Sequence, residues 1–479
     1  MRESPEKYDV VVVGSGSTGG VVASRLSECD GNRVLLLEAG PDFPDEETVP
    51  PGFVTGGRQW AHQAVPEHDW NLLSEPLPDG RRIRLWRGRL VGGSSMTNGC
   101  VAVRGAPADF VRWEECGGST WGFEALRPLY EIVEREINVH VSRPENWQPI
   151  HHAFRDGFAE LGFRAVADLN VPDAWGGVIG PVSLNRRNDI RQGTLVNYIR
   201  RARTQPTFEL RANALVDRVL FSGSRVVGVR HIDGAGRSHT TEADVVVLSA
   251  GAYGSPSILL RSGIGPAREL AALGIKPVVD LPVGSTLMDH GRVGVFLEAP
   301  PALADMHAPA FAVFARGDGW LASTATIDEE CGICGLSFVL AAENRGGTVT
   351  LASSDPDAPP RITHRYEQSA FLPVFEVLAE LLGTRPLANV RCLDQGRYGR
   401  ELVTERIGTA FHPAGSCGIG AVVDEGLRVH GVEGLVVADA SIFPGHVSNN
   451  PNLTSFVVGE QAARLLAGRR PERGQPGRA

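Results

Sequence analysis

The sequence has 479 residues, of which 42% are apolar and 22% are charged. This composition excludes disordered and fibrous proteins and predicts a globular chain of two or three domains. The 47 basic residues against 56 acidic ones leave a formal charge of −9 at pH 7. Because the chain has no long basic block, we expect no nucleic-acid partner.

Hydrophobic runs are short throughout the chain. Residues 10–13 and 245–248 have the length of strands, far below the ~20 apolar residues of a membrane helix, so we expect no membrane span. The polar start leads directly into a strand, so we expect no signal peptide. Seven scattered cysteines do not suggest a disulfide framework, and we expect a cytoplasmic protein. Cys331 and Cys334 form a lone C-x-x-C, interpreted as two ordinary thiols, so no metal is expected.

The first forty residues follow the pattern of a βαβ unit. A β-branched run over 8–13 is followed by a glycine loop, a helical pattern from residue 21 and a second buried strand over 33–37. In this loop Gly14 permits a tight turn, Gly16 lets the backbone approach a pyrophosphate, and Gly19 lets the helix pack close to the strand. Glu38, 24 residues after Gly14, is placed to accept from ribose hydroxyls. The unit predicts a dinucleotide site but does not choose between FAD and NAD.

The next elements in chain order are less regular. Residues 41–86 have no sustained period and are interpreted as long functional loops. Helical patterns cover 123–136 and 150–161. Strands over 208–212, 216–221 and 226–232 predict a small meander before the buried strand 245–248. The stretch around 297–400 is assigned to a second domain, and the tail from residue 469 is expected to be disordered.

Two glycine-rich segments help to choose the cofactor. Residues 87–105 are small and polar, so their backbone can lie against a flat ligand. Residues 249–266 combine a strand end, a turn and a helix that is closed by a glycine. Either segment alone could be an ordinary glycine-rich loop.

Together with the βαβ unit, these segments resemble the glucose-methanol-choline (GMC) family of FAD-dependent oxidoreductases over nearly the whole chain. Residues 281–290 are similar to the family's LPGVGxNLQDH, with one residue dropped near Val283 and Thr286 in place of Asn. Residues 408–417 resemble its HPxGTC, and 427–432 with 437–444 resemble the strand that closes over the flavin. The loop 449–454 resembles the NPN variant of choline-oxidase-like members.

The resemblance implies an α/β fold, with a doubly wound, Rossmann-like FAD-binding domain and a second, smaller α+β substrate-binding domain. We expect the FAD-binding domain to comprise 1–150, 206–296 and 405–470, the substrate domain to comprise 151–205 and 297–404, and the tail 471–479 to be disordered. Only 64 residues separate His290 from Asp355, so part of the substrate domain is expected to be trimmed relative to the family.

The resemblance also implies a reaction. In the family a histidine takes the hydroxyl proton of an alcohol while hydride passes to flavin N5, and a second His or Asn fixes the oxygen. His412 matches the first position and Asn450 the second. A neutral imidazole, with an unperturbed pKa near ~6.5, can accept that proton, and an amide can donate to the forming alkoxide. Asn449, Asn452 and His446 are near enough in sequence to be confused with Asn450.

The expected cofactor is FAD, bound non-covalently, because Thr97 stands where choline-oxidase-like members carry the histidine that bonds the flavin. The expected substrate is an alcohol or a sugar, with O2 or another acceptor reoxidising the flavin. The alternative is a non-redox lyase or a light-driven decarboxylase on the same scaffold.

No chemistry is assigned to His290, His430, His151 or His152. The predicted FAD-binding residues are Gly14, Ser15, Gly16, Thr18, Gly19, Glu38, Ala39, Arg89, Gly92, Gly93, Ser94, Asn98, Gly99, Val101, Val216, Ala250, Gly251, Asp439, Ala440, Pro451 and Asn452.

Overall fold

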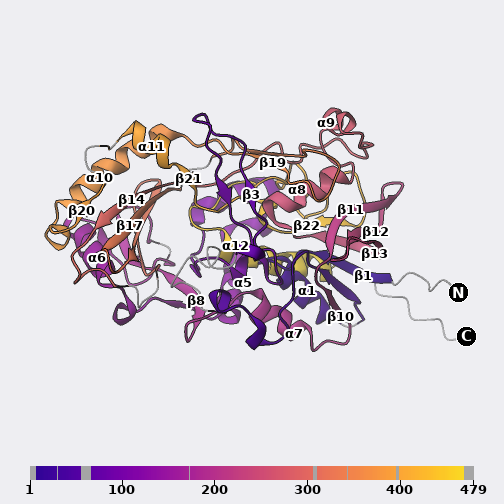
Figure 1. Ribbon diagram of the computed structural model, residues 1–479. Coiled ribbons are helices and arrows are strands. Elements are labelled where there is room, and N and C mark those ends of the chain that lie inside the picture. Colours follow the sequence, from indigo (N-terminus) through magenta and orange to yellow (C-terminus); the bar gives the residue numbers. More distant parts are fainter. Residues whose placement is uncertain are drawn as a thin grey trace, which may run out of the picture.

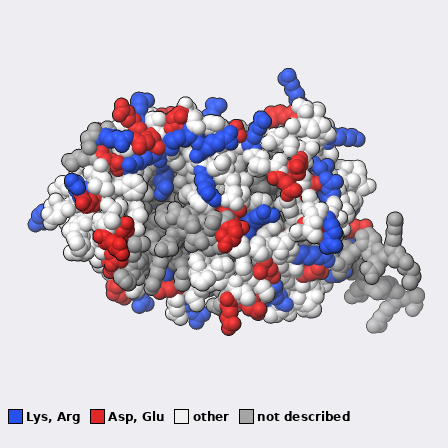
Figure 2. Space-filling model, in the orientation of Figure 1, with Lys and Arg blue, Asp and Glu red and all other residues white. Residues whose placement is uncertain are grey.

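The structure is a computed structural model that describes residues 7–29, 31–54, 66–171, 173–305, 310–341, 344–394, 397 and 399–468. Figure 1 shows two sheets at opposite ends of an elongated molecule, one around β1 and β13 and the other around β14 and β17. Acidic and basic side chains are interspersed over the face seen in Figure 2. The predicted tail 471–479 lies outside the described residues. No helix in the described ranges is long and apolar enough to cross a membrane.

The first sheet has a parallel core. Its strands run in the order β10-β2-β1-β13-β12-β11, and β22 pairs with β13. The β-branched run of β1 is almost wholly buried because neighbouring strands flank it and both of its faces are covered. The strands are β1 (Lys7–Val13), β2 (Val34–Leu37), β10 (Phe208–Arg211), β11 (Leu215–Ser222), β12 (Arg225–Ile232), β13 (Ser238–Leu248) and β22 (Leu435–Val437).

One strand assignment was wrong. We expected 208–212 to belong to the meander, but β10 pairs in parallel with β2 at the far edge of the sheet. Only β11, β12 and β13 form the antiparallel meander. The link from β10 to β11 contains no hairpin turn and carries the chain past Gly40 and Glu38, whose carbonyls accept from Asn213 and Ala214. Strands that follow one another in sequence therefore end up at opposite sides of the sheet.

The predicted helix 123–136 is confirmed, and that at 150–161 lies one residue earlier. Helix α1 (Gly19–Ser27) packs on α12 (Asn452–Ala467), and α12 packs on α5 (Phe123–Glu136). Gly459 makes the close approach of α1 and α12 possible, because a Cβ there would lie 2.8 Å from the Cβ of Val21. On another part of the sheet, α8 (Gly251–Arg261) contacts β11, and α9 (Ala267–Ala272) follows.

The second sheet is largely antiparallel, in the order β20-β14-β17-β16-β15-β7-β6, with β21 paired to β14. Burial alternates along β17, so one of its faces packs into a core with α6 and α10 while the other remains open. The strands are β6 (Arg164–Ala165), β7 (Val178–Pro181), β14 (Gly291–Glu298), β15 (Val313–Arg316), β16 (Trp320–Asp328), β17 (Ile333–Leu340), β20 (Arg391–Cys392) and β21 (Gly408–Thr409). The helices are α6 (Pro149–Glu160), α10 (Leu372–Leu382) and α11 (Arg400–Arg406).

The remaining helices and strands are shorter or belong to small separate sheets. They are α2 (Pro51–Val54), α4 (Val111–Gly117), α7 (Arg200–Ala202), β3 (Leu72–Leu73), β4 (Arg84–Leu85), β5 (Val139–Val141), β8 (Ser183–Arg187), β9 (Ile190–Arg191), β18 (Thr348–Thr350) and β19 (Arg361–Thr363). Among residues 41–86, the described part contains β3, β4 and single helical turns.

Two contacts bear on the predicted domain limits. Leu195, Tyr198 and Ile199 belong to the apolar core of the first sheet, where their turn contacts α1. Strand β14 begins at Gly291, inside the second sheet. We therefore propose that the first part of the substrate domain ends before residue 195 and that its second part begins near residue 291. The other limits stay predictions.

Candidate active site

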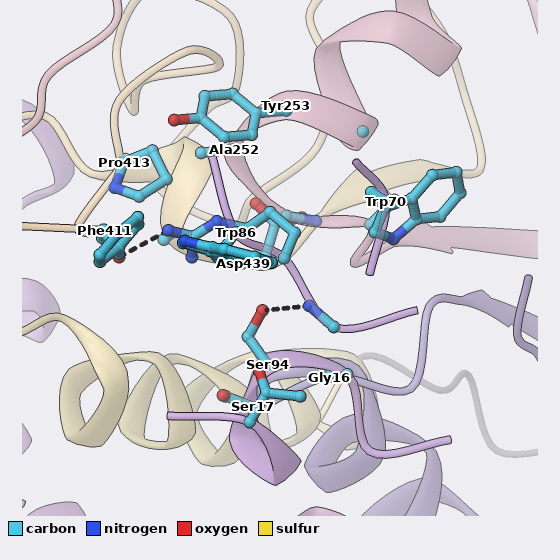
Figure 3. A pocket seen from close by; sticks show the side chains of 18 of the residues that line it. Gly16, Ser17, Trp70, Trp86, Ser94, Ala252, Tyr253, Phe411, Pro413 and Asp439 are labelled. Carbon is cyan, nitrogen blue, oxygen red and sulfur yellow. Dashed lines mark hydrogen bonds between the residues drawn. The ribbon is translucent and has the colours of Figure 1, made fainter. Parts of the chain in front are cut away.

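A cavity of about 560 Å³ runs from the carboxyl ends of β1 and β2 to the open face of the second sheet. It lies where open α/β sheets bind their ligands. In Figure 3, Gly16, Ser17 and Ser94 lie on one side of it, and Phe411, Pro413 and Tyr253 lie across from them. Most of the predicted site residues line it: Gly14, Gly16, Thr18, Glu38, Ala39, Arg89, Gly93, Ser94, Asn98, Gly99, Val101, Val216, Ala250, Gly251, His412, Asp439, Ala440, Asn450, Pro451 and Asn452.

Three predicted site residues lie behind this lining instead. The hydroxyl of Ser15 accepts from the backbone N–H of Gly92 at 2.9 Å, which ties the first glycine loop to the second. A Cβ on Gly19 would lie 1.9 Å from the carbonyl oxygen of Gly14, so only glycine lets the helix start this close to the strand. Gly92 has a φ of +96°, in the left-handed region that favours glycine. These residues shape the loops that form the cavity.

Glu38 is buried at the end of β2. Its carboxylate accepts from the N–H of Ser15 at 3.0 Å, the hydroxyl of Ser15 at 2.5 Å and the N–H of Gly40 at 3.0 Å. Burial raises the pKa of Glu38, and these three donors oppose the shift. The contact of Glu38 with ribose hydroxyls stays a prediction.

The cavity fits an FAD-like dinucleotide at several points. A Cβ built on Gly16 or Gly251 would meet nothing within 4 Å, so the backbone there leaves open space. The amide nitrogen Nδ2 of Asn452 is buried without a protein partner, although its Oδ1 accepts from Ser17. Both Gly16 and Asn452 line the cavity, and α1 begins three residues after Gly16, so the positive end of its dipole favours a phosphate there.

His412 is held at three points. Its backbone N–H donates to Asp289 Oδ1 at 2.9 Å, and its carbonyl oxygen accepts from His446 Nε2 at 2.6 Å. Its ring nitrogen Nδ1 lies 3.0 Å from Nδ1 of His290. The preceding residue, Phe411, has a φ of +64° and its carbonyl accepts from Arg87. This costly backbone conformation persists because the surrounding contacts hold it, and it fixes the direction of the imidazole.

His290, to which the sequence assigns no chemistry, is fully buried beside His412. Its ring packs against that of His446, with 3.9 Å between centroids and 38° between the ring planes, and its Nε2 is buried without a protein partner. The two histidines lie 122 residues apart, so no local pattern could have indicated this contact. His151, by contrast, is a satisfied buried residue whose Nε2 contacts the carbonyl of Thr324.

The surroundings of His412 keep its imidazole neutral. Burial lowers its pKa to about 3, Asp289 opposes that shift, and His446, Arg87 and Arg292 reinforce it. Burial also lowers the pKa of His290 well below its ordinary value, and the neighbouring histidines add to this effect. Both imidazoles are therefore neutral at pH 7, the form in which a ring nitrogen can accept a proton.

The neighbouring asparagines differ in their contacts. Asn450 lines the cavity, and its amide donates one hydrogen bond to the carbonyl of Val101 at 2.8 Å, which leaves a second N–H. Asn449 is buried outside the cavity lining and is used at both ends. Its Nδ2 donates to the carbonyl of Arg104, and its Oδ1 accepts from Arg316. Asn450 is therefore open to a ligand, whereas Asn449 stabilises the fold.

Sequence reasoning missed much of the far wall. The described cavity lining includes Trp70, Trp86 and Tyr253, together with side chains of the second sheet such as Phe314, Ser323 and Ser337. The available signals were the place of the two tryptophans in the loops 41–86, which we expected to be functional, and the place of Tyr253 in the glycine-rich segment 249–266. The strands of the second sheet carry ordinary small and apolar residues, and nothing in their pattern marks the ligand-facing side.

No cluster of three or more metal-ligating side chains exists in the part of the chain that the structure describes. Cys331 is exposed, whereas Cys334 is buried.

Comparisons with protein families agree with the site. A family model described as GMC oxidoreductase matches residues 8–292, and a second model of the same description matches 342–459. An oxygen-dependent choline dehydrogenase of Burkholderia ambifaria is 32% identical, over 97% of this chain and 94% of that protein. An uncharacterized GMC-type oxidoreductase of Rhodococcus erythropolis is 30% identical, over 96% of this chain and 98% of that protein.

Solved structures share the fold. Formate oxidase from Aspergillus oryzae superposes with a TM-score of 0.87 at 22% identity and covers 98% of this chain, with 99% of its own chain matched. Pyridoxine 4-oxidase from Mesorbium loti has a TM-score of 0.85 at 25% identity, with 97% of this chain and all of its own chain matched (100%). The predicted combination of an FAD-binding α/β domain and a substrate domain is confirmed by this likeness.

Proposed function

Because the chain belongs to the GMC oxidoreductase family and is an FAD-dependent enzyme that oxidises an alcohol to the carbonyl, we propose roles for two of its residues. His412 accepts the hydroxyl proton of the alcohol, and Asn450 holds the alcohol oxygen. The observation that carries this proposal is the position of both side chains on one cavity together with the predicted FAD-binding loops. Bound FAD supplies the acceptor for the hydride that leaves the alcohol carbon.

The contact with His290 supports one tautomer of His412. If Nδ1 of His412 carries the hydrogen and donates to Nδ1 of His290, then Nε2 of His412 has a free electron pair. Nε2 is the nitrogen left for a substrate in the cavity. Once it takes the proton, the imidazolium can donate more strongly through Nδ1 to His290. His290 therefore acts as a positioning residue for the base.

Asn450 suits the second role because an amide donates without competing for the proton. Its hydrogen bond to Val101 fixes the plane of the amide, so the second N–H has a defined direction. As the alcohol loses its proton, the oxygen becomes more negative and a fixed donor stabilises it.

The test is anaerobic mixing of the purified holoenzyme with a panel of alcohols and sugars in the dark, followed at the flavin absorbance. We expect bleaching of the flavin by a substrate alcohol and formation of the matching carbonyl compound. A lyase would form product without net reduction of the flavin, and a light-driven decarboxylase would be inactive in the dark. Product formation without bleaching would therefore contradict the proposal. The family comparisons do not favour that alternative.

Asn450→Ala should slow flavin reduction by roughly 10- to 10³-fold without abolishing it, because the fixed donor is lost while the base remains. Stopped-flow absorbance measures the rate. Asn449→Ala is the comparison: it should destabilise the fold, since Arg316 and the carbonyl of Arg104 lose a partner, with a smaller effect on the rate of the folded enzyme. A larger rate effect in Asn449→Ala or His446→Ala would assign the second role to that residue instead.

We also propose that FAD is bound without a covalent link. Thr97 lines the cavity at the position that the resemblance gives to the bonding histidine, and a neutral hydroxyl is a poor nucleophile. Precipitation of the holoenzyme with acid should release yellow FAD into the supernatant. A pellet that keeps its colour after washing would show a covalent bond.

The remaining partners follow from the same proposal. We infer that O2 or another acceptor reoxidises the flavin, that the substrate is an alcohol or a sugar hydroxyl, and that no nucleic acid takes part. A cytoplasmic location is proposed from the scattered free cysteines.

A further inference from the structure

A buried arginine lies behind one wall of the cavity. Arg191 ends the short strand β9 and is fully buried. Its Nε donates to the carbonyl oxygen of Phe53 at 3.1 Å, and its Nη1 donates to Asn98 Oδ1 at 2.7 Å. Its third nitrogen, Nη2, is buried without a hydrogen-bond partner in the described structure. Asn98 belongs to the cavity lining, so Arg191 can act on a ligand through this contact and through its charge.

The contacts of Asn98 fix the direction of its amide. Its Oδ1 accepts from Arg191 Nη1 and also from the backbone N–H of Cys100 at 2.9 Å. Both of these groups can only donate, so the amide cannot turn over without bringing donors face to face. The Nδ2 end of the amide therefore points away from Arg191 and is the end that Asn98 can offer to the cavity.

The positive charge of Arg191 is not balanced by an acidic neighbour. No carboxylate in the described ranges interacts with Arg191, and residues 54–65, which follow Phe53 in the chain, contain no Asp or Glu. Burial lowers the pKa of Arg191 and the neighbouring Cys100 opposes that shift, but a guanidinium group stays protonated at neutral pH. A negative charge on the ligand side of Asn98 would therefore be stabilised by Arg191.

The turn that contains Asn98 also contacts the proposed catalytic residues. The carbonyl oxygen of Val101, three residues after Asn98, accepts from the amide of Asn450 at 2.8 Å, and all three residues line the cavity. The proposed function places the alcohol oxygen at Asn450, with the hydride acceptor beside the alcohol carbon. Flavin that has taken up a hydride carries one more negative charge than oxidised flavin, because a hydride brings one proton and two electrons.

We propose that Arg191 is a positioning residue for the flavin: it holds the Asn98 amide with its N–H groups toward the cavity, and its charge favours the reduced, negatively charged flavin over the oxidised form. This inference rests on the proposed function, because that function places the flavin ring beside Asn98. It gives a part in the reaction to a residue outside the described cavity lining.

The test measures the midpoint potential of the bound flavin by anaerobic equilibration of the holoenzyme with a redox dye, which needs no alcohol. Arg191→Gln removes the charge, so its flavin should be harder to reduce. We expect at least a tenfold loss of the preference for reduced flavin, which corresponds to about 30 mV for a two-electron couple. Arg191→Lys should stay closer to the wild-type potential, because it keeps the charge, but should lose FAD faster on dilution, because it lacks the planar fork.

Arg186→Gln is the matched control. Arg186 is a buried arginine at the paired position of β8, and it forms an ion pair with Asp189. Its variant should have the wild-type potential. Asn98→Asp is a second variant that keeps an acceptor for the same two donors and adds a counter-charge for Arg191, so the fold should persist while the potential falls.

A wild-type potential in Arg191→Gln overturns the inference, and so does an equal shift in Arg186→Gln, which would indicate a general effect of charge. If Arg191→Gln does not fold, a wild-type potential in Asn98→Asp overturns it instead. If the potentials shift as expected but no alcohol reduces the wild-type flavin, the proposed function fails while the effect of Arg191 on the flavin stands.

Discussion

His412→Ala is expected to retain FAD and the fold but to reduce the flavin roughly 10²- to 10⁴-fold more slowly with an alcohol substrate, the usual range for general base assistance. Hydride leaves the alcohol carbon readily only as the oxygen becomes an alkoxide, and in neutral water the proton does not leave without an acceptor. His412 lines the cavity, and Asp289, His446 and His290 hold its backbone and ring in place. Stopped-flow absorbance under anaerobic conditions measures the rate.

His152→Ala serves as the matched histidine control, since His152 lies beside Trp147 on α6, away from the cavity lining. It should reduce the flavin at the wild-type rate. Wild-type kinetics in His412→Ala would place the base elsewhere.

The pH dependence of this rate follows from the low pKa of His412. A group whose pKa is lowered to about 3 is already neutral at pH 5, so flavin reduction should be nearly constant from pH 5 to pH 9. An exposed histidine would instead give a rise through its ordinary pKa near ~6.5. Activity should fall only as the pH approaches the lowered pKa, where the imidazole takes a proton. A step near pH 6.5 that disappears in His412→Ala would contradict this expectation.

Gly19→Ala is expected to cause the second large effect, the loss of bound FAD together with a lower stability. The new Cβ would lie 1.9 Å from the carbonyl oxygen of Gly14, a contact with backbone that no side-chain movement can relieve. Overpacking of this kind typically costs about 1–3 kcal/mol. The glycine loop and the start of α1 must therefore separate. The measurements are the ratio of FAD to protein after gel filtration and the thermal unfolding temperature.

Gly16→Ala is the matched variant in the same loop. A Cβ there would meet no protein atom within 4 Å but would enter the cavity. We expect its apoprotein to unfold at the wild-type temperature while its affinity for FAD falls. Full FAD occupancy in Gly19→Ala, or undiminished affinity in Gly16→Ala, would show that the phosphate groups bind elsewhere.

Local sequence alone determined the first half of the site. Within forty residues, the chain forms the β-branched strand, the loop with three glycines, the helix and Glu38. A local steric or hydrogen-bonding requirement explains each of these features. The order of the later motifs was enough to indicate the family, and with it His412, Asn450 and the FAD cavity. The roles of these two residues stay predictions, although both side chains line that cavity.

Tertiary structure alone decided the rest. His290 meets His412 across 122 residues, β10 joins β2 instead of the meander, and Arg292 lies on the cavity face of the second sheet. No local sequence pattern predicts these positions, because the spacing of apolar residues along a helix or a strand shows only which of its sides is buried. Which distant segment covers that side depends on the path of the chain between them. Contacts such as the one between His290 and His412 form only when separate strands and loops pack around a common cavity.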